Sequence, residues 1–95
     1  MTDFTITRDD GPSGGRYWTV VDGHEAEMTY SRAGTSRIII DHTAVPAALG
    51  GRGVGKALVW QAVQDARNEN FKIIPLCPFA KATLDKTPEW QDVLN

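Results

Sequence analysis

The sequence predicts a mixed α/β fold of the α+β class, in which an antiparallel meander is followed by a β-α-β crossover and short C-terminal helices. The first half alternates apolar and polar residues between short turns, as half-buried strands do. A glycine-rich loop then leads into a segment whose apolar residues recur every three or four positions, which is typical of an amphipathic helix. With 95 residues and 41% hydrophobic content, the chain is expected to form one domain over residues 1–95.

The meander is expected to begin at residues 4–7, FTIT, whose side chains alternate between apolar and polar. The next eight residues, RDDGPSGG, have the composition of a loop. Residues 16–21, RYWTVV, contain the aromatic and β-branched types that favour strands, and the Asp22-Gly23 pair is a hairpin signal.

Two more strands complete the meander. Residues 24–31 alternate again, and the face expected to be buried carries Ala26, Met28 and Tyr30. A turn at residues 33–35 leads to residues 36–42, a β-branched strand that ends at the glycine loop.

The second half predicts a helix from about Val54 to Asn68, with Asn70 as its C-terminal cap. Residues 72–76, KIIPL, form the next strand, which a right-handed crossover makes parallel to the strand before the loop. Pro75 cannot donate to a strand ladder, so the two parallel strands are expected to splay there. Two short helices follow, one opened by Pro78 and one by Thr87 as N-cap with proline next to it.

The glycine loop at residues 50–56 predicts an anion site. The first turn of a helix has backbone N–H groups without intrahelical partners, and the helix dipole makes them partly positive. Glycines let an anion approach this backbone, and Arg52 and Lys56 add formal charge. Ala57 stands where the phosphate loop of nucleotide hydrolases has Ser or Thr. The dinucleotide fingerprint follows the first strand of a β-α-β unit, whereas the sequence before this loop is hairpin-like, so both common nucleotide motifs are set aside.

Residues 45–58 resemble the pyrophosphate-binding motif of the GNAT superfamily of acetyl-coenzyme A-dependent N-acetyltransferases, [RQ]-x-x-G-x-[GA]. Gly53 and Gly55 match its glycines, whereas Gly50 replaces the basic or amide residue. Together with KIIPLCPF and TPEWQDVL, the segment is similar to the small stand-alone YjdJ-like group over about residues 15–94.

This resemblance implies a GNAT-like fold, acetyl-CoA as cofactor, and the coenzyme's pantetheine arm between the splayed strands. It implies cofactor contacts from the end of the strand and from the loop: Thr43, Ala44, Val45, Gly50, Gly51, Arg52, Gly53, Val54, Gly55 and Lys56. A backbone N–H near residues 43–45 would stabilise the oxyanion as an amine attacks the thioester.

The catalytic groups that the resemblance implies are incomplete. Ala44 and Ala47 occupy positions where the small relatives commonly have carboxylates. Many superfamily members use a tyrosine after the splayed strand as the acid, but no tyrosine follows Tyr30 here. His42 is a candidate base, and its alternative interpretation, which the residue type favours, is a hydrogen-bonded structural histidine. Asp41 and Glu25 are alternatives, each also readable as a solvated or capping carboxylate. Cys77 is a candidate proton donor or transient acyl acceptor, and otherwise a small buried residue.

The leading hypothesis is transfer of an acetyl group from acetyl-CoA to a small amine or a protein lysine. The alternatives are a non-catalytic CoA or acyl-CoA binding module, and an interaction domain that has lost the cofactor. A net charge of −2 argues against nucleic-acid binding, and no metal-ligand spacing is present. One cysteine, no signal peptide and no long apolar run favour a cytoplasmic protein, without a membrane partner, that is a monomer or weak homodimer.

Overall fold

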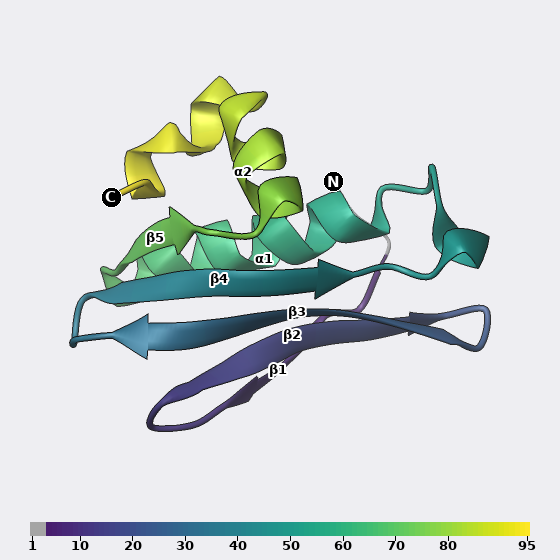
Figure 1. The fold of residues 1–95 in the computed structure, drawn as a ribbon, viewed down its shortest axis with the longest axis horizontal. Coiled ribbons are helices and arrows are strands. Elements are labelled where there is room, and N and C mark those ends of the chain that lie inside the picture. The colour runs from purple at the N-terminus through teal and green to yellow at the C-terminus, as the bar shows by residue number, and fades with distance from the viewer. Residues whose placement is uncertain (1–3) are drawn as a thin grey trace.

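The computed structural model describes residues 4–95, and residues 1–3 of the predicted domain lie outside this range. Five strands form one sheet in the order β1-β2-β3-β4-β5, with β5 parallel to β4 and the other pairs antiparallel. The elements are β1 (Thr7–Asp10), β2 (Gly14–Val21), β3 (His24–Ala33), β4 (Arg37–Ala44), the 3₁₀ helix η1 (Ala47–Leu49), α1 (Val54–Glu69), β5 (Lys72–Pro75), α2 (Pro78–Asp85) and the 3₁₀ helix η2 (Pro88–Val93). This order confirms the predicted meander and crossover (Figure 1).

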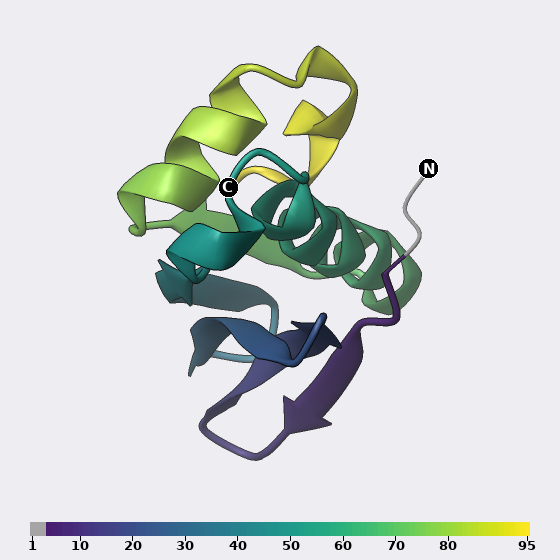
Figure 2. The same ribbon diagram turned by 90° about the vertical axis from the view of Figure 1, so that its right-hand side faces the viewer.

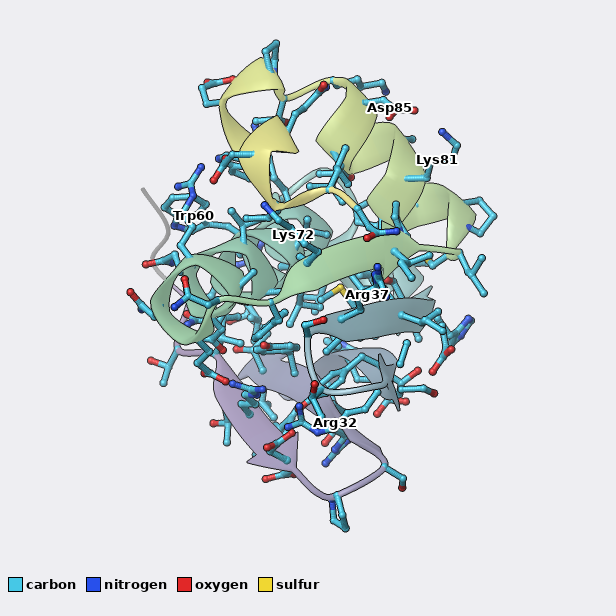
Figure 3. All side chains as sticks on the ribbon, turned by 90° about the vertical axis from the view of Figure 1, so that its left-hand side faces the viewer. Arg32, Arg37, Trp60, Lys72, Lys81 and Asp85 are labelled. Carbon is cyan, nitrogen blue, oxygen red and sulfur yellow. The ribbon has the colours of Figure 1, made fainter. Side chains whose placement is uncertain are left out.

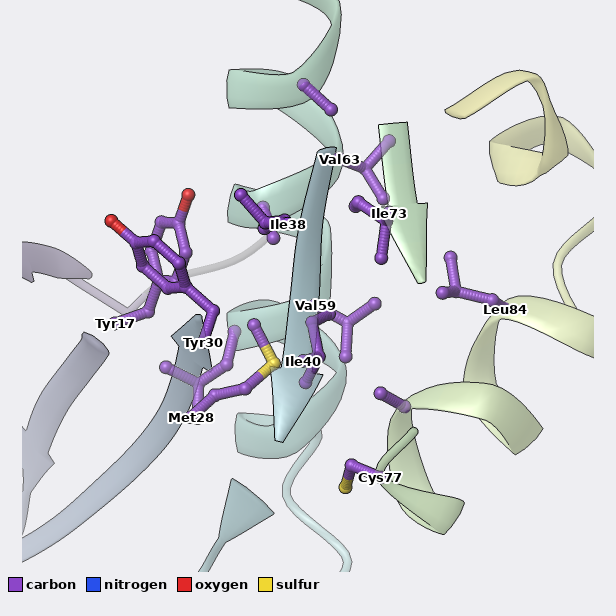
Figure 4. Packing of buried hydrophobic residues seen from close by; sticks show 14 of the residues in the cluster. Tyr17, Met28, Tyr30, Ile38, Ile40, Val59, Val63, Ile73, Cys77 and Leu84 are labelled. Atoms are coloured by element: carbon purple, nitrogen blue, oxygen red, sulfur yellow. The ribbon is translucent and has the colours of Figure 1, made fainter. Parts of the chain in front are cut away.

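One face of the sheet is covered by α1, whereas α2 and η2 close the edge at β5 (Figures 1 and 2). The face of β3 predicted to be buried, with Ala26, Met28 and Tyr30, is fully enclosed. Figure 4 shows Met28 and Ile40 of the sheet meeting Val59 of α1. The opposite face carries charged and polar side chains together with Trp18, Val20 and Ile39. No helix among residues 4–95 covers this face (Figure 2). None of the described helices is both long and apolar enough for a membrane crossing.

The ends of α1 follow from its sequence. Gly53 adopts a left-handed conformation at the N-cap, with φ of 78°. Asn70 adopts the same conformation at the C-cap and donates its backbone N–H to the Ala66 carbonyl, as predicted. Pro78 begins α2 as predicted. The last segment differs from expectation, because it is a 3₁₀ helix and the Thr87 hydroxyl donates to the Thr83 carbonyl rather than capping it.

The N-terminal prediction was wrong in its boundaries, because β1 spans Thr7–Asp10 and the predicted loop residues Arg8 to Asp10 pair with β2. These charged residues are stabilised as a strand by partners from elsewhere in the chain. Arg8 contacts Asp65 and Glu69 of α1, and Asp10 pairs with Arg32 of β3. Such distant partners are invisible to a reading of local composition, so the segment resembled a solvated turn.

We expect Arg8→Ala to lower the free energy of unfolding by about 2–3 kcal/mol, because it leaves partly buried polar groups without their partner. Arg8 is only 17% exposed and donates to the Tyr30 hydroxyl at 3.1 Å, Asp65 at 3.3 Å and Glu69 at 2.6 Å. Urea denaturation measures the change. Lys81→Ala, which removes an exposed pair within one helix, is the control and should change stability by less than about 0.5 kcal/mol.

Candidate functional site

A cavity of about 440 Å³ lies where the glycine loop and the start of α1 meet α2. We call it the glycine-loop cavity. Its lining comes from three segments of the chain: Val45, Pro46, Ala47, Leu49, Gly50, Gly51, Gly53, Val54, Gly55, Lys56, Phe79, Thr83, Lys86 and Thr87. Most of the loop residues predicted to contact a cofactor are therefore brought to one place. The lining includes two lysines and no carboxylate.

The backbone at the start of α1 is arranged for an anion. The first hydrogen bond into the helix runs from the Ala57 N–H to the Gly53 carbonyl at 3.0 Å. The N–H groups of the first turn before Ala57 have no intrahelical acceptor by helix geometry. They lie at the end of α1 that lines the cavity, where the helix dipole favours negative charge.

Gly55 has an ordinary helical backbone conformation but a close neighbour. A Cβ at this position would come within 2.6 Å of Cζ of Phe79 in α2. The missing side chain therefore lets the aromatic ring of α2 approach the first turn of α1. The contact sets one wall of the glycine-loop cavity, and a side chain at position 55 would force the Phe79 ring to shift.

The two cations predicted for the loop, Lys56 and Arg52, point to different places in the structure. Lys56 lines the glycine-loop cavity, and its ammonium lies 5.6 Å from the centre of the Trp90 ring. Arg52 instead turns its guanidinium to Asp22, at 2.6 Å, and ties the loop to the β2–β3 turn. The hydrogen bond from Arg52 holds the pKa of Asp22 below its ordinary value. The Arg52 side chain therefore does not line this cavity.

The parallel strands separate at the point that Pro75 predicted. Pairing between β4 and β5 ends with Ile40 opposite Pro75, and the last connection is the Cys77 N–H to the Ile40 carbonyl at 3.0 Å. β5 thus ends one residue earlier than predicted. Beyond Ile40, the end of β4 pairs only with β3, which leaves its other side without a strand partner among the described residues.

A β-bulge changes which side chains the end of β4 presents to the interior. His42 pairs with Thr29 but Ile40 pairs with Tyr30, so Asp41 is an extra residue on β4. The alternation is shifted by one, so Thr43 takes the side of β4 that Ile40 occupies before the bulge, and His42 takes the opposite side. Thr43 contacts Cys77, while His42 is exposed. The two predicted catalytic side chains therefore flank the end of β4 on different sides.

Cys77 is 4% exposed and its Sγ lies 3.4 Å from Oγ1 of Thr43. Burial raises the pKa of the thiol. The Thr43 hydroxyl and the backbone N–H groups of Ala80 and Phe79, in the first turn of α2, act in the opposite direction, and the net pKa is lowered from its ordinary value. Cys77 is thus a buried thiol whose ionised form is stabilised by its surroundings.

A second, open cavity of about 470 Å³ lies at the end of β4, and we call it the strand-end hollow. His42 and Glu25, both sequence candidates, line it together with Glu27. Its remaining lining residues are Thr43, Ala44, Val45 and Pro46. Val45 and Pro46 also line the glycine-loop cavity, so the two cavities share a wall. Glu25 and Glu27 both accept from Arg16, at 3.2 and 2.8 Å.

Sequence reasoning missed the contribution of α2 to the glycine-loop cavity. Phe79, Thr83 and Lys86 are spaced four and three residues apart, so they share one face of the helix, and all three line the cavity. This spacing was visible in the sequence. It becomes part of the site only because the fold places α2 against the glycine loop, which the spacing alone does not show.

Comparisons with known proteins agree with this fold. The family profile of the GCN5-related N-acetyltransferases matches residues 16–93. The structure is similar to the solution structure of a GCN5-like candidate N-acetyltransferase from Staphylococcus aureus, with 39% identity, a TM-score of 0.74, and coverage of 100% of this chain and 91% of that one. A comparison with curated proteins returned no significant match. The chain therefore belongs to the GCN5-related N-acetyltransferase (GNAT) family.

Proposed function

We propose that this protein binds acetyl-CoA in the glycine-loop cavity and transfers the acetyl group to an amine that enters through the strand-end hollow. The observation that carries the proposal is the shared wall of the two cavities at Val45 and Pro46. One cavity has cations and free helix N–H groups, which suit an anionic coenzyme. The other is open, so an amine has access from outside.

The residues present fit the diphosphate of CoA. The N–H groups of residues 53–56 and the Lys56 ammonium would hold it, and the absence of a Cβ at Gly53 leaves the approach open. The unpaired side of β4 after Ile40 would hold the pantetheine arm by its backbone groups. Bound in this way, the coenzyme supplies an acetyl thioester.

Cys77 and His42 take the proton-transfer roles in this proposal. The amine nitrogen bonds to the acetyl carbon as the carbon–sulfur bond breaks. The Cys77 thiol gives its proton to the departing sulfur, and solvent restores that proton. His42, on the other side of β4 and exposed in the strand-end hollow, accepts the proton that the amine loses.

The experiment is incubation of the pure protein with acetyl-CoA and a mixture of amines, followed by measurement of free thiol. Release of many thiols per chain, only when amines are present, supports acetyl transfer. Saturable acetyl-CoA binding without thiol release would instead support a non-catalytic binding module. The ion pairs of Glu25 and Glu27 with Arg16 favour this alternative, because they occupy the two carboxylates of the strand-end hollow. Intact mass after acetyl-CoA alone tests whether Cys77 is itself acetylated.

Thr43→Val should move the pH dependence of acetyl transfer. The hydroxyl of Thr43 is one of the groups that lower the pKa of Cys77, so its removal raises that pKa. A proton donor is lost as pH rises through its pKa, and the alkaline limb of kcat should therefore shift to higher pH in the variant. If the alkaline limb of the kcat profile stays at the wild-type pH in an active Thr43→Val variant, Cys77 is not the proton donor.

A further inference from the structure

The glycine-loop cavity contains a cation that neither the glycine motif nor the α1 N-terminus accounts for. Lys86, at the C-cap of α2, also lines the cavity. Its position on the cavity-facing side of α2 follows from its spacing to Phe79 and Thr83.

Lys86 is unusual among the basic residues because it is unpaired. The other described arginines and lysines, apart from Lys56, have an oxygen partner: Arg8, Arg16, Arg32, Arg37, Arg52, Arg67, Lys72 and Lys81. Within residues 4–95, Lys56 and Lys86 have no hydrogen bond or ion pair to an oxygen atom, and both line the same cavity. In a chain with a net charge of −2, this is a local concentration of uncompensated positive charge.

The two lysines come from different elements of the cavity wall. Lys56 is in the first turn of α1, with its ammonium 5.6 Å from the centre of the Trp90 ring, and the Phe79 ring approaches Gly55 beside it. Lys86 is seven residues further along α2 than Phe79, which is about 10 Å along a helix axis. An anion held at the start of α1 therefore leaves Lys86 available for a second, separate anionic group.

We propose that Lys86 binds the 3′-phosphate of coenzyme A and makes the cavity selective for 3′-phosphorylated coenzyme. This inference rests on the proposed function. The nucleotide end of CoA carries its diphosphate on the 5′ oxygen of the ribose and a separate monophosphate on the 3′ oxygen. The first matches the α1 N-terminus with Lys56, and the second matches Lys86. A lysine ammonium on a phosphate gives a charge-assisted hydrogen bond.

The test compares CoA with 3′-dephospho-CoA by titration calorimetry on wild type, Lys86→Ala and Lys81→Ala. Wild type should bind CoA about tenfold more tightly than 3′-dephospho-CoA. Lys86→Ala should lose about tenfold in affinity for CoA and almost nothing for 3′-dephospho-CoA, so that the two ligands become nearly equal. Lys86→Arg, which keeps the cation, should retain most of the preference for CoA.

Lys81→Ala is the matched control, since Lys81 lies on the same helix but pairs with Asp85 at 3.1 Å (Figure 3). It should leave both affinities unchanged. Equal weakening of both ligands by Lys86→Ala, or no weakening of CoA, would overturn the assignment of Lys86 while leaving CoA binding intact. Failure of folded wild type to bind either ligand would overturn the proposed function and this inference together.

Discussion

Gly53→Val should weaken binding of acetyl-CoA by about 100-fold, which corresponds to about 2.7 kcal/mol. Gly53 has φ of 78°, and nothing lies within 4 Å of the position that a Cβ would occupy. The added branched side chain therefore has room in the free protein, but it stands where the diphosphate must approach the N–H groups of α1. The predicted loss corresponds to one or two charge-assisted hydrogen bonds, each worth about 1.5–3 kcal/mol.

The control for this substitution is Gly34→Val. Gly34 has φ of 71° in the β3–β4 turn, is likewise free of neighbours within 4 Å, and lies outside both cavities. Each variant should lose about 1–2 kcal/mol of stability, because a side chain is strained in the left-handed region. Titration calorimetry should show the affinity loss in Gly53→Val alone. Equal affinities for acetyl-CoA in the two folded variants would show that the glycine loop is not part of the binding site.

Cys77→Ala should lower kcat for acetyl transfer by about 100-fold and change the Kd for acetyl-CoA less than threefold, in line with the loss of a positioned proton donor. Cys77 lies outside the residues that line the glycine-loop cavity, so its removal does not take away a binding contact there. The sulfur is small and the site is nearly closed, so the stability of the variant should fall by only about 1 kcal/mol.

Cys77→Ser separates chemistry from packing. The serine hydroxyl is close to the thiol in size and can still bond to Oγ1 of Thr43, but it is a far weaker acid. Steady-state assays should show a similar loss of kcat in the serine and alanine variants. If both variants keep the wild-type kcat, the role of Cys77 is purely structural. If only the serine variant keeps it, the packing of residue 77 matters and its acidity does not.

The core of the fold could be predicted because its signals are local. Alternation placed Ala26, Met28 and Tyr30 on the buried face of β3, and the structure encloses all three. Asn70 was identified as the cap of α1 because few residues adopt the left-handed conformation readily. Pro75 indicated the end of strand pairing because proline has no N–H to donate.

The remainder depends on contacts between segments that are distant in the sequence. Arg8 forms part of a strand because α1 supplies two carboxylates, a fact that its own neighbours do not reveal. The bulge at Asp41 moved Thr43, rather than His42, to the side of Cys77. A one-residue shift of this kind reverses every side chain after it, and alternation alone gave no sign of it.

The central claim is that the glycine-loop cavity binds the coenzyme, and an NMR titration of the ¹⁵N-labelled protein with acetyl-CoA tests it most directly. We expect the largest, saturable amide shifts at residues 53–56, with further shifts on the cavity-facing side of α2 at Thr83 and Lys86. The amides of the β3–β4 turn near Gly34 should not move. Absence of saturable shifts in the folded protein, or shifts confined to surfaces away from this cavity, would contradict the account.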